Sequence, residues 1–205
     1  MEKVAIIDYG MGNLDSVAHA VEECGGVPMI TSQPGDLELV NRIILPGVGA
    51  FAMGMQHIHE RGLIEILGEQ VIGKGVPFLG ICLGMQILAT KGYEGGETKG
   101  LGWIEGEVKR FESRTCNERI PHIGWNEVVF AKPSALFTDI PSGKDFYFVH
   151  SYHLVCSNEQ DIIAHTNYCG SFISAVRKKN IFGVQFHPEK SQRAGFQVIK
   201  NFLKY

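Results

Sequence analysis

A cysteine between two glycines is the feature of this sequence with the clearest chemical potential. Cys82 lies in the uncharged stretch PFLGICLGMQIL, with Gly80 before it and Gly84 after it. The pattern predicts that an apolar strand ends and a helix begins here, which is the context of a nucleophile elbow. Glycines permit the sharp turn, and unpaired N–H groups at a helix start favour a thiolate. Cys82 is therefore a candidate nucleophile; the alternative is a buried core thiol, the usual state of a free cysteine.

A thiol nucleophile needs a base, and the stretch QFHPEK offers one. His187 and Glu189 follow the strand-like run IFGVQF, and Pro188 predicts that the chain leaves the sheet at this point. Residues two apart on an extended segment point the same way, so the Glu189 carboxylate can orient the His187 imidazole. The alternative is a surface turn with a solvated glutamate and an incidental histidine.

A third motif, LPGVGAF, also follows a strand-like run. Gly47 and Gly49 let the backbone present N–H groups without side-chain cover, including that of Val48. Together with the Leu83 N–H after the cysteine, such groups suit an oxyanion hole. In isolation the stretch could equally be a plain tight turn. Because ligands collect at the carboxyl ends of parallel strands, one crevice can hold all three motifs.

The elements that must position these motifs alternate between strand and helix in the first half of the chain. Asn13 is the predicted N-cap and Gly25 the predicted C-cap of the first helix. Such alternation favours a parallel sheet with helices on both faces. Strand patterns cover 3–9, 27–32, 42–47 and 76–81, and helix patterns cover 13–26, 52–73 and 83–90.

After about residue 100, short strand-like runs separated by turns predict mostly antiparallel strands. These runs cover 106–111, 126–130, 146–155, 161–168, 172–180 and 181–188, and a closing helix is predicted over 191–205. We therefore expect one α/β domain over residues 1–205. Its central, mostly parallel sheet is flanked by helices, and additional antiparallel strands lie in the C-terminal half.

The composition argues against several classes of protein. The 205 residues carry a formal net charge of −3, an ordinary balance that gives no support for binding nucleic acid or a membrane surface. An odd number of cysteines without a CxxC pair disfavours a disulfide framework or a thiolate zinc site. The start of the chain lacks a signal-peptide pattern, and the longest uncharged run is too short for a membrane helix. We expect a cytoplasmic protein without a metal or cofactor. The remaining cysteines, Cys24, Cys116, Cys156 and Cys169, are expected to be small buried hydrophobes.

Three further motifs favour structural roles. The HIH stretch at 57–59 has no third ligand at suitable spacing, so a surface helix is the better interpretation. The glycine-rich stretch 92–102 lacks the Gly-Lys-Ser/Thr ending of a phosphate-binding loop. The RKK stretch at 177–179 predicts a charged hairpin turn.

In this order and spacing, PGVGAF, GICLGMQ and HPEKS resemble the class I glutamine amidotransferases, which release ammonia from glutamine with a Cys-His-Glu triad. Within that family, DYGMGNL, PHIGWN and FYFVHSY resemble motifs of the glutaminase subunits of imidazole glycerol phosphate synthase. Together these motifs span the chain from end to end, and their combination is specific, although each motif alone is not.

The resemblance assigns roles position by position. It implies Cys82 as nucleophile, His187 as acid and base, and Glu189 as the group that orients it. The implied oxyanion donors are the Leu83 N–H and an N–H within Gly47–Gly49, that of Val48 after a peptide flip. The implied glutamine-binding residues are Gln86, Ser151 and Tyr152, and the residues implied to face a partner around an ammonia exit are Asn13, Trp125, Tyr147 and Lys190. If Tyr147 and Phe148 alternate on a strand, only one of them can face a partner.

The implied partner is the cyclase/synthase subunit of that enzyme, in a heterodimer. The pair would make imidazole glycerol phosphate and aminoimidazole carboxamide ribotide in histidine biosynthesis. Three alternatives stay open on the sequence. The chain could serve a different synthase in a paralogous pathway, it could be a catalytically silent binding subunit, or it could be a cysteine peptidase or redox sensor on a similar sheet.

Overall fold

A computed structural model describes residues 2–112 and 118–205. Within this part of the chain, nine strands form one sheet in the order β2-β1-β3-β4-β13-β12-β11-β8-β9. The strands are β1 (Lys3–Ile7), β2 (Val27–Thr31), β3 (Arg42–Gly47), β4 (Phe78–Cys82), β8 (His122–Phe130), β9 (Lys144–His150), β11 (Ile162–Thr166), β12 (Phe172–Lys178) and β13 (Ile181–Val184). The strands from β2 to β13 in this order pair in parallel, and those from β13 to β9 pair antiparallel. The predicted α/β fold is confirmed, and the sheet is mixed.

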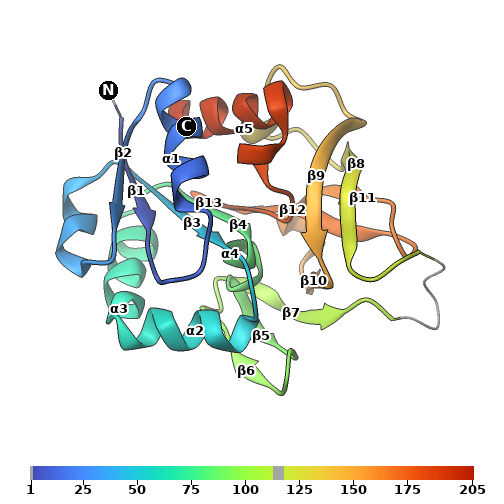
Figure 1. Ribbon diagram of the computed structural model, residues 1–205, viewed down its shortest axis with the longest axis horizontal. Helices are drawn as coiled ribbons and strands as arrows, with labels where there is room; N and C mark the ends of the chain where they lie inside the picture. Colours follow the sequence, from blue (N-terminus) through green and yellow to red (C-terminus); the bar gives the residue numbers. More distant parts are fainter. Residues whose placement is uncertain (1, 113–117) are drawn as a thin grey trace.

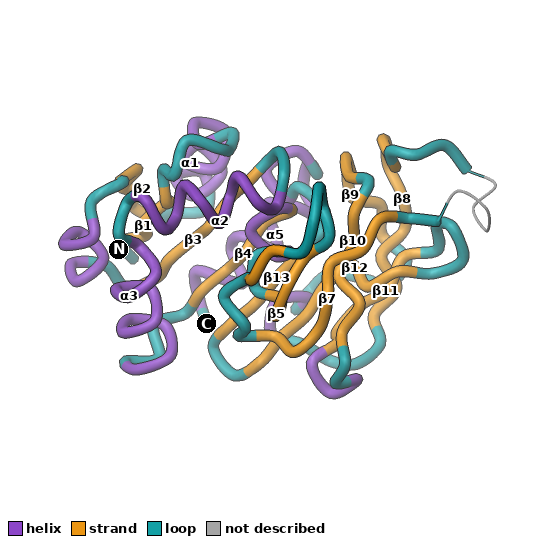
Figure 2. The backbone as a smooth tube through the Cα atoms, turned by 90° about the horizontal axis from the view of Figure 1, so that it is seen from below, coloured by secondary structure: helices purple, strands orange, loops and turns teal. Residues whose placement is uncertain are grey.

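A second, four-stranded sheet has the order β10-β7-β5-β6. Its strands are β5 (Ala89–Gly92), β6 (Thr98–Lys99), β7 (Ile104–Arg110) and β10 (Tyr152–Cys156). The run 146–155 therefore does not stay in one sheet, because its first part is β9 and its second part is β10. Figure 2 shows β7 and β10 running across one face of the molecule beside β11 and β12.

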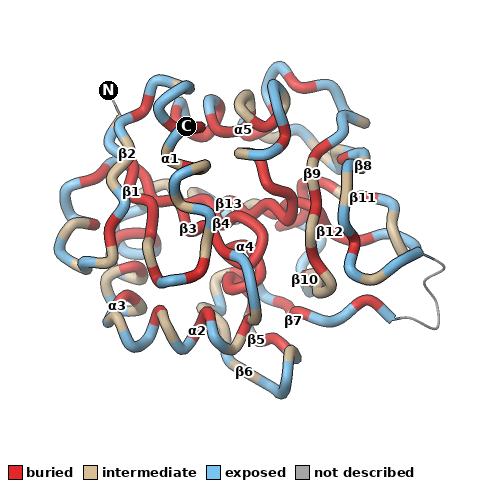
Figure 3. The backbone as a smooth tube through the Cα atoms, in the orientation of Figure 1, coloured by how far each residue is buried: buried red, intermediate tan, exposed pale blue. Residues whose placement is uncertain are grey.

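The helices cover both faces of the large sheet (Figure 1). They are α1 (Leu14–Glu23), α2 (Phe51–Glu60), α3 (Leu63–Leu67), α4 (Leu83–Gln86) and α5 (Gln192–Lys204), and shorter helical turns span Pro34–Leu39, Gly68–Gly73, Ala135–Phe137, Glu159–Asp161 and Pro188–Lys190. Helices α1 and α5 lie on one face, whereas α2, α3 and the second sheet lie on the other. Each face has its own apolar core, and the central strands β3, β4 and β13 are buried throughout (Figure 3).

Local patterns account for these elements. Strand β1 is buried on both faces apart from its first residue, as expected for a parallel strand between two helical layers. Helix α1 buries Val17, Ala20 and Val21, which share one side of a helix. Asn13 occupies the predicted N-cap position, although among the described residues its side chain makes no capping hydrogen bond. The C-cap of the helix is Cys24, one position before the predicted C-cap Gly25. Gly25 follows with a φ of +88°, a left-handed conformation typical of the residue after a C-cap.

The predicted helix over 83–90 was too long. Helix α4 ends at Gln86, and β5 begins at Ala89. Backbone carbonyls that a longer helix would use internally accept hydrogen bonds from a distant segment instead: Leu101 N donates to Ile87 O at 2.9 Å and Gly102 N to Ala89 O at 3.0 Å. This non-local pairing is invisible in the local sequence pattern.

Candidate active site

Three strand ends meet at one edge of the large sheet. In the parallel pairing of β3 with β4, Gly47 lies opposite Cys82. In the pairing of β13 with β4, Val184 lies opposite Ile81, so the chain after β13 leaves the sheet beside the cysteine. The three motifs predicted to share a crevice are therefore brought together by neighbouring strands.

Cys82 occupies a strained turn between β4 and α4. Its φ of +54° and ψ of −107° are rare for a residue with a side chain. The flanking glycines have a steric cause: a Cβ on Gly80 would lie 2.5 Å from the Gly84 carbonyl oxygen, and one on Gly84 would lie 1.8 Å from that of Leu45. The structure thus gives the predicted elbow geometry, with a thiol that is 5% exposed.

The predicted base and its orienter form a buried pair. His187 Nδ1 lies 2.9 Å from Glu189 Oε1, and both side chains are at most 2% exposed. His187 Nε2 has no regular hydrogen-bond partner among the described residues, which leaves it to face Cys82. Burial alone would lower the pKa of His187, but negative charge on Cys82 and the Glu189 carboxylate raise it to about 10. The His187 imidazole therefore binds a proton readily when the neighbouring Cys82 carries negative charge.

Three of the four residues predicted for an oxyanion hole border the same cavity. Val48, Gly49 and Leu83 line it, and Gly49 has a φ of +112°, which a residue with a side chain rarely adopts. Gly47 lies against the side chain of Tyr9. A Cβ at this position would lie 2.0 Å from the Tyr9 hydroxyl, so there is room only for glycine. Two loops from different strands thus converge on the space next to Cys82.

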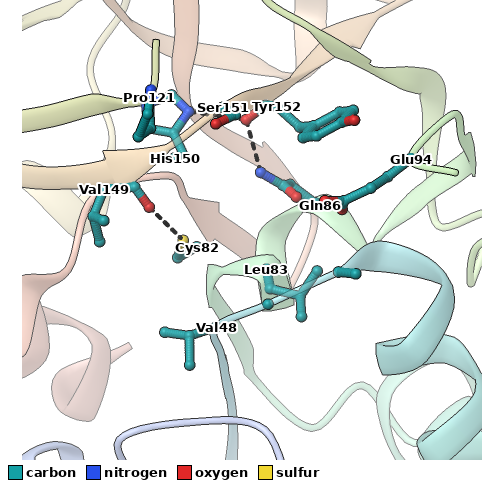
Figure 4. Close-up of a pocket in the computed structure, with 12 residues that line it drawn as sticks. Val48, Cys82, Leu83, Gln86, Glu94, Pro121, Val149, His150, Ser151 and Tyr152 are labelled. Carbon is teal, nitrogen blue, oxygen red and sulfur yellow. Dashed lines mark hydrogen bonds between the residues drawn. The ribbon is translucent and has the colours of Figure 1, made fainter.

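The cavity has a volume of about 390 Å³, and Cys82 lies in its wall (Figure 4). Gln86, Ser151 and Tyr152, predicted to bind glutamine, also line it. Gln86 Nε2 donates to the Tyr152 carbonyl oxygen at 2.8 Å, so the elbow helix and β10 are tied together across the cavity. The space is polar on the Gln86 side and suits a small amide substrate.

Three polar residues of the site were missed by the sequence analysis. Gln185, fully buried, donates from Nε2 to Cys82 Sγ at 3.6 Å and accepts from Gln86 Nε2 at 3.1 Å. Glu94 lines the cavity and accepts a hydrogen bond from the Phe51 N–H at 2.9 Å. His150 lines it too. Gln185 could have been found as a polar residue inside an apolar strand pattern. Glu94 lies in the glycine-rich stretch 92–102, whose pattern indicates only that it is not a phosphate-binding loop.

Most residues predicted to face a partner form one exposed group. Trp125 is 48% exposed, and its ring lies 6.1 Å from that of Tyr147, with Lys190 Nζ 5.9 Å from the same Tyr147 ring. Phe148 is fully buried, so of the two neighbouring aromatics Tyr147 is the outward one. The Tyr147 carbonyl also accepts a hydrogen bond from the His187 N–H at 2.9 Å. The exposed face therefore adjoins the predicted base, His187.

Two of the minor motifs have the expected structural roles. His57 and His59 lie in the last turn of α2, and His57 Nδ1 is 3.0 Å from the Tyr9 carbonyl oxygen. Lys179 has a φ of +54° in the turn between β12 and β13, so the RKK stretch does form a charged hairpin turn. In the described ranges no group of three or more His, Cys, Asp or Glu side chains is arranged to hold a metal ion. No helix of residues 2–112 and 118–205 is both long and apolar enough to cross a membrane.

The expectation for the other cysteines was wrong in part. Cys24 and Cys156 are half-buried rather than buried, and each thiol donates to a backbone carbonyl at 3.2 Å, which places them at the margin of the core. Cys169 is disulfide-bonded, contrary to the expectation of a free thiol. Cys116 lies outside the described residues.

Comparison with known sequences supports the same assignment. Residues 5–205 match the family described as "Glutamine amidotransferase class-I". A relative from Moorella thermoacetica, named imidazole glycerol phosphate synthase subunit HisH, is 48% identical over 202 residues, covering 98% of this chain and 94% of the relative. A relative from Campylobacter jejuni strain RM1221, named imidazole glycerol phosphate synthase subunit HisH 1, is 46% identical over 201 residues, with 98% and 99% covered.

Solved structures share the fold at lower identity. The structure of PurLQS from Thermotoga maritima has a TM-score of 0.76 at 22% identity, covering 100% of this chain and 99% of that one. The crystal structure of a glutamine amidotransferase has a TM-score of 0.75 at 18% identity, covering 98% and 97%. The matched family, the relatives and the shared fold agree, and the chain belongs to the class I glutamine amidotransferases, grouping with the HisH subunits of that family.

Proposed function

We propose that this chain hydrolyses glutamine to glutamate and ammonia with Cys82 as nucleophile, His187 as acid and base, and Glu189 as the group that orients it. One observation carries the proposal: a strained cysteine elbow opens into a cavity beside a buried His187–Glu189 pair whose Nδ1–Oε1 distance is 2.9 Å. A nucleophile, a base and an orienter in this order are what an acyl-transfer site requires.

The reaction follows from these positions. The Cys82 thiolate attacks the side-chain carbonyl carbon of glutamine, and backbone N–H groups of Leu83 and Val48 stabilise the oxyanion. Removing one such donor typically costs about 3 kcal/mol of barrier. His187 gives its proton to the leaving ammonia and then takes one from the water that hydrolyses the glutamyl thioester. Its raised pKa, about 10, supplies the proton in the first step, while Glu189 holds the ring.

The far end of the cavity suits the amino-acid end of the substrate. Glu94 places a carboxylate in the cavity wall, where it can pair with the α-ammonium of glutamine. Ser151 and Tyr152 also line the cavity, and Gln86 is fixed by its bond to the Tyr152 carbonyl. Because the substrate is held at both ends, its amide carbon can be presented to the sulfur.

We infer further that the ammonia passes to a synthase subunit docked as a heterodimer on the face of Trp125, Tyr147 and Lys190. The relatives from Moorella thermoacetica and Campylobacter jejuni are named as subunits of imidazole glycerol phosphate synthase, which supports this partner and the histidine pathway. Aromatic residues and a cation exposed together are favoured at protein interfaces. Ammonia released under such a cover would stay neutral and unprotonated until it reacts.

The test is glutamate release from glutamine by the purified chain. It is measured with the chain alone, and then with the synthase subunit of a histidine pathway and its nucleotide substrate. The proposal expects strong stimulation by the partner and no turnover with Cys82→Ala in any mixture. Glutaminase activity that does not change when this synthase subunit is added would indicate that the chain serves a different synthase. No activity in any mixture would refute the proposed catalysis and favour a silent binding subunit.

A further inference from the structure

Two buried histidines outside the proposed triad form a hydrogen-bonded pair behind the cavity. His122 on β8 lies opposite His150 on β9, and His122 Nδ1 is 3.1 Å from His150 Nε2. Both side chains are buried, at 3% and 6% exposed. His150 borders the cavity, whereas His122 does not.

The hydrogen-bond partners at the two ends of this histidine pair determine which nitrogen of each ring carries the proton. At one end, His150 Nδ1 is 2.9 Å from the Tyr152 carbonyl oxygen, which can only accept. His150 must therefore donate from Nδ1 and accept at Nε2, so the His122 nitrogen facing it, Nδ1, must donate. His122 Nε2 is then an acceptor.

The other end agrees with this assignment. Asn126 Nδ2 lies 3.4 Å from His122 Nε2. The orientation of this amide is set independently, because Asn126 Oδ1 accepts from the Glu127 N–H at 2.8 Å and Nδ2 donates to the Asn167 carbonyl at 3.2 Å. An amide nitrogen can only donate. One tautomer of each histidine thus satisfies all the contacts without conflict.

The surroundings keep both rings neutral and in place. Burial lowers the pKa of His122 to about 4 and that of His150 to about 3. The His122 ring stacks between Tyr168 and Phe148, with centroid distances of 3.8 and 4.8 Å. A neutral, stacked ring pair can hold a fixed donor–acceptor order.

The Tyr152 carbonyl also accepts a hydrogen bond from Gln86 (Figure 4), and further bonds connect Gln86 with Cys82. The same carbonyl accepts from Gln86 Nε2, whose second hydrogen goes to Gln185 Oε1, and Gln185 Nε2 donates to Cys82 Sγ. Gln86 thus donates both of its amide hydrogens, and Gln185 accepts from Gln86 and donates to the sulfur. The Tyr152 carbonyl is therefore the point where bonds from the histidine pair and from the sulfur converge.

We propose that His122 is a positioning residue for the glutamine pocket: by donating to His150 it fixes the Tyr152 carbonyl, and through it Gln86. This role rests on the proposed glutaminase function. The PHIGWN segment would then have two roles: His122 supports the pocket, and the exposed Trp125 on the same strand, β8, belongs to the proposed partner surface.

The test compares two replacements of His122. His122→Phe keeps an aromatic ring between Tyr168 and Phe148 but removes the donor, so His150 Nε2 loses its partner. His122→Asn places an amide donor near the position of the lost Nδ1–H. The loss of one hydrogen bond, about 0.5–1.5 kcal/mol, predicts a rise of roughly two- to thirteenfold in the KM for glutamine of the Phe variant. We expect its kcat to stay within about twofold of the wild type, and the Asn variant to recover the wild-type KM.

A second measurement does not depend on activity. Nitrogen-15 NMR of the wild-type chain should show His150 protonated on Nδ1 alone, and in His122→Phe the unprotonated Nε2 should shift to the position of a nitrogen that accepts no hydrogen bond, because Nδ1 keeps its bond to the Tyr152 carbonyl. An unchanged KM in His122→Phe beside an active wild type would overturn the positioning role, as would wild-type His150 protonated on Nε2. A wild type that is inactive with every partner would instead refute the glutaminase function itself.

Discussion

Replacing Gly84 by alanine should disable the proposed nucleophile, Cys82, without altering that residue itself. A Cβ on Gly84 would lie 1.8 Å from the Leu45 carbonyl oxygen, at least about 1.2 Å short of the closest approach of about 3.0 Å. Because that oxygen belongs to the β3 backbone, α4 must shift away from the strand and carry Cys82 with it. A displacement of about 1 Å can cost roughly a hundredfold in rate, so we expect kcat/KM for glutamine to fall by that order.

The assay is partner-stimulated glutamate release, with the urea midpoint of unfolding measured in parallel. Overpacking of this kind typically costs about 1–3 kcal/mol of stability, so the variant should remain folded. Gly68→Ala is the matched control, because a Cβ there meets nothing within 4 Å and the backbone is already helical. Alanine at that position should stabilise the chain by up to ~1 kcal/mol and leave activity unchanged. A Gly84→Ala enzyme within threefold of wild type would refute the claim that close backbone packing sets the elbow.

Two further predictions follow from buried groups. Cys82→Ala should lower the pKa of His187 from about 10, because burial lowers this pKa and negative charge on Cys82 is the largest influence that raises it. An NMR titration of His187 whose midpoint does not change in the variant would contradict the interaction between His187 and Cys82. Tyr9→Phe should raise the free energy of unfolding by about 1 kcal/mol, since the buried Tyr9 hydroxyl has no hydrogen-bond partner among the described residues and such groups are costly. Urea unfolding measures this change, and a destabilised variant would show that the hydroxyl has a partner.

Much of the site could be predicted because its parts carry local signatures. Gly80 is required by a backbone contact with Gly84 within one strand–turn–helix unit, so the spacing of the two glycines is visible in the sequence, although Gly84 itself is required by its contact with Leu45 on the neighbouring strand. The His187–Glu189 pair is likewise local, with Pro188 turning the chain out of the sheet. Alternation of strands and helices then predicted that these motifs share one edge.

What could not be predicted depends on contacts between distant segments. Gln185 looked like part of an apolar strand, and only its contacts with Cys82 and Gln86, about a hundred positions earlier, reveal its role. The early end of α4 is set by residues 100–104, and the second sheet by pairing of β5 with β7 and of β7 with β10. Glu94 enters the cavity through a glycine-rich connection whose path no local pattern specifies.

The placement of His187 just after β13, the strand beside β4, has a consequence during synthesis on the ribosome. The cysteine elbow and its oxyanion loop are translated within the first 84 residues, but the histidine follows only after about a hundred more. Strand β13 inserts between β4 and β12, so the parallel half of the sheet is completed last by a C-terminal strand. A nascent chain therefore carries the thiol without the group that would activate it. On this layout, the proposed glutaminase site is complete only after residue 189 has been translated, and a chain that stops before that residue should be inactive.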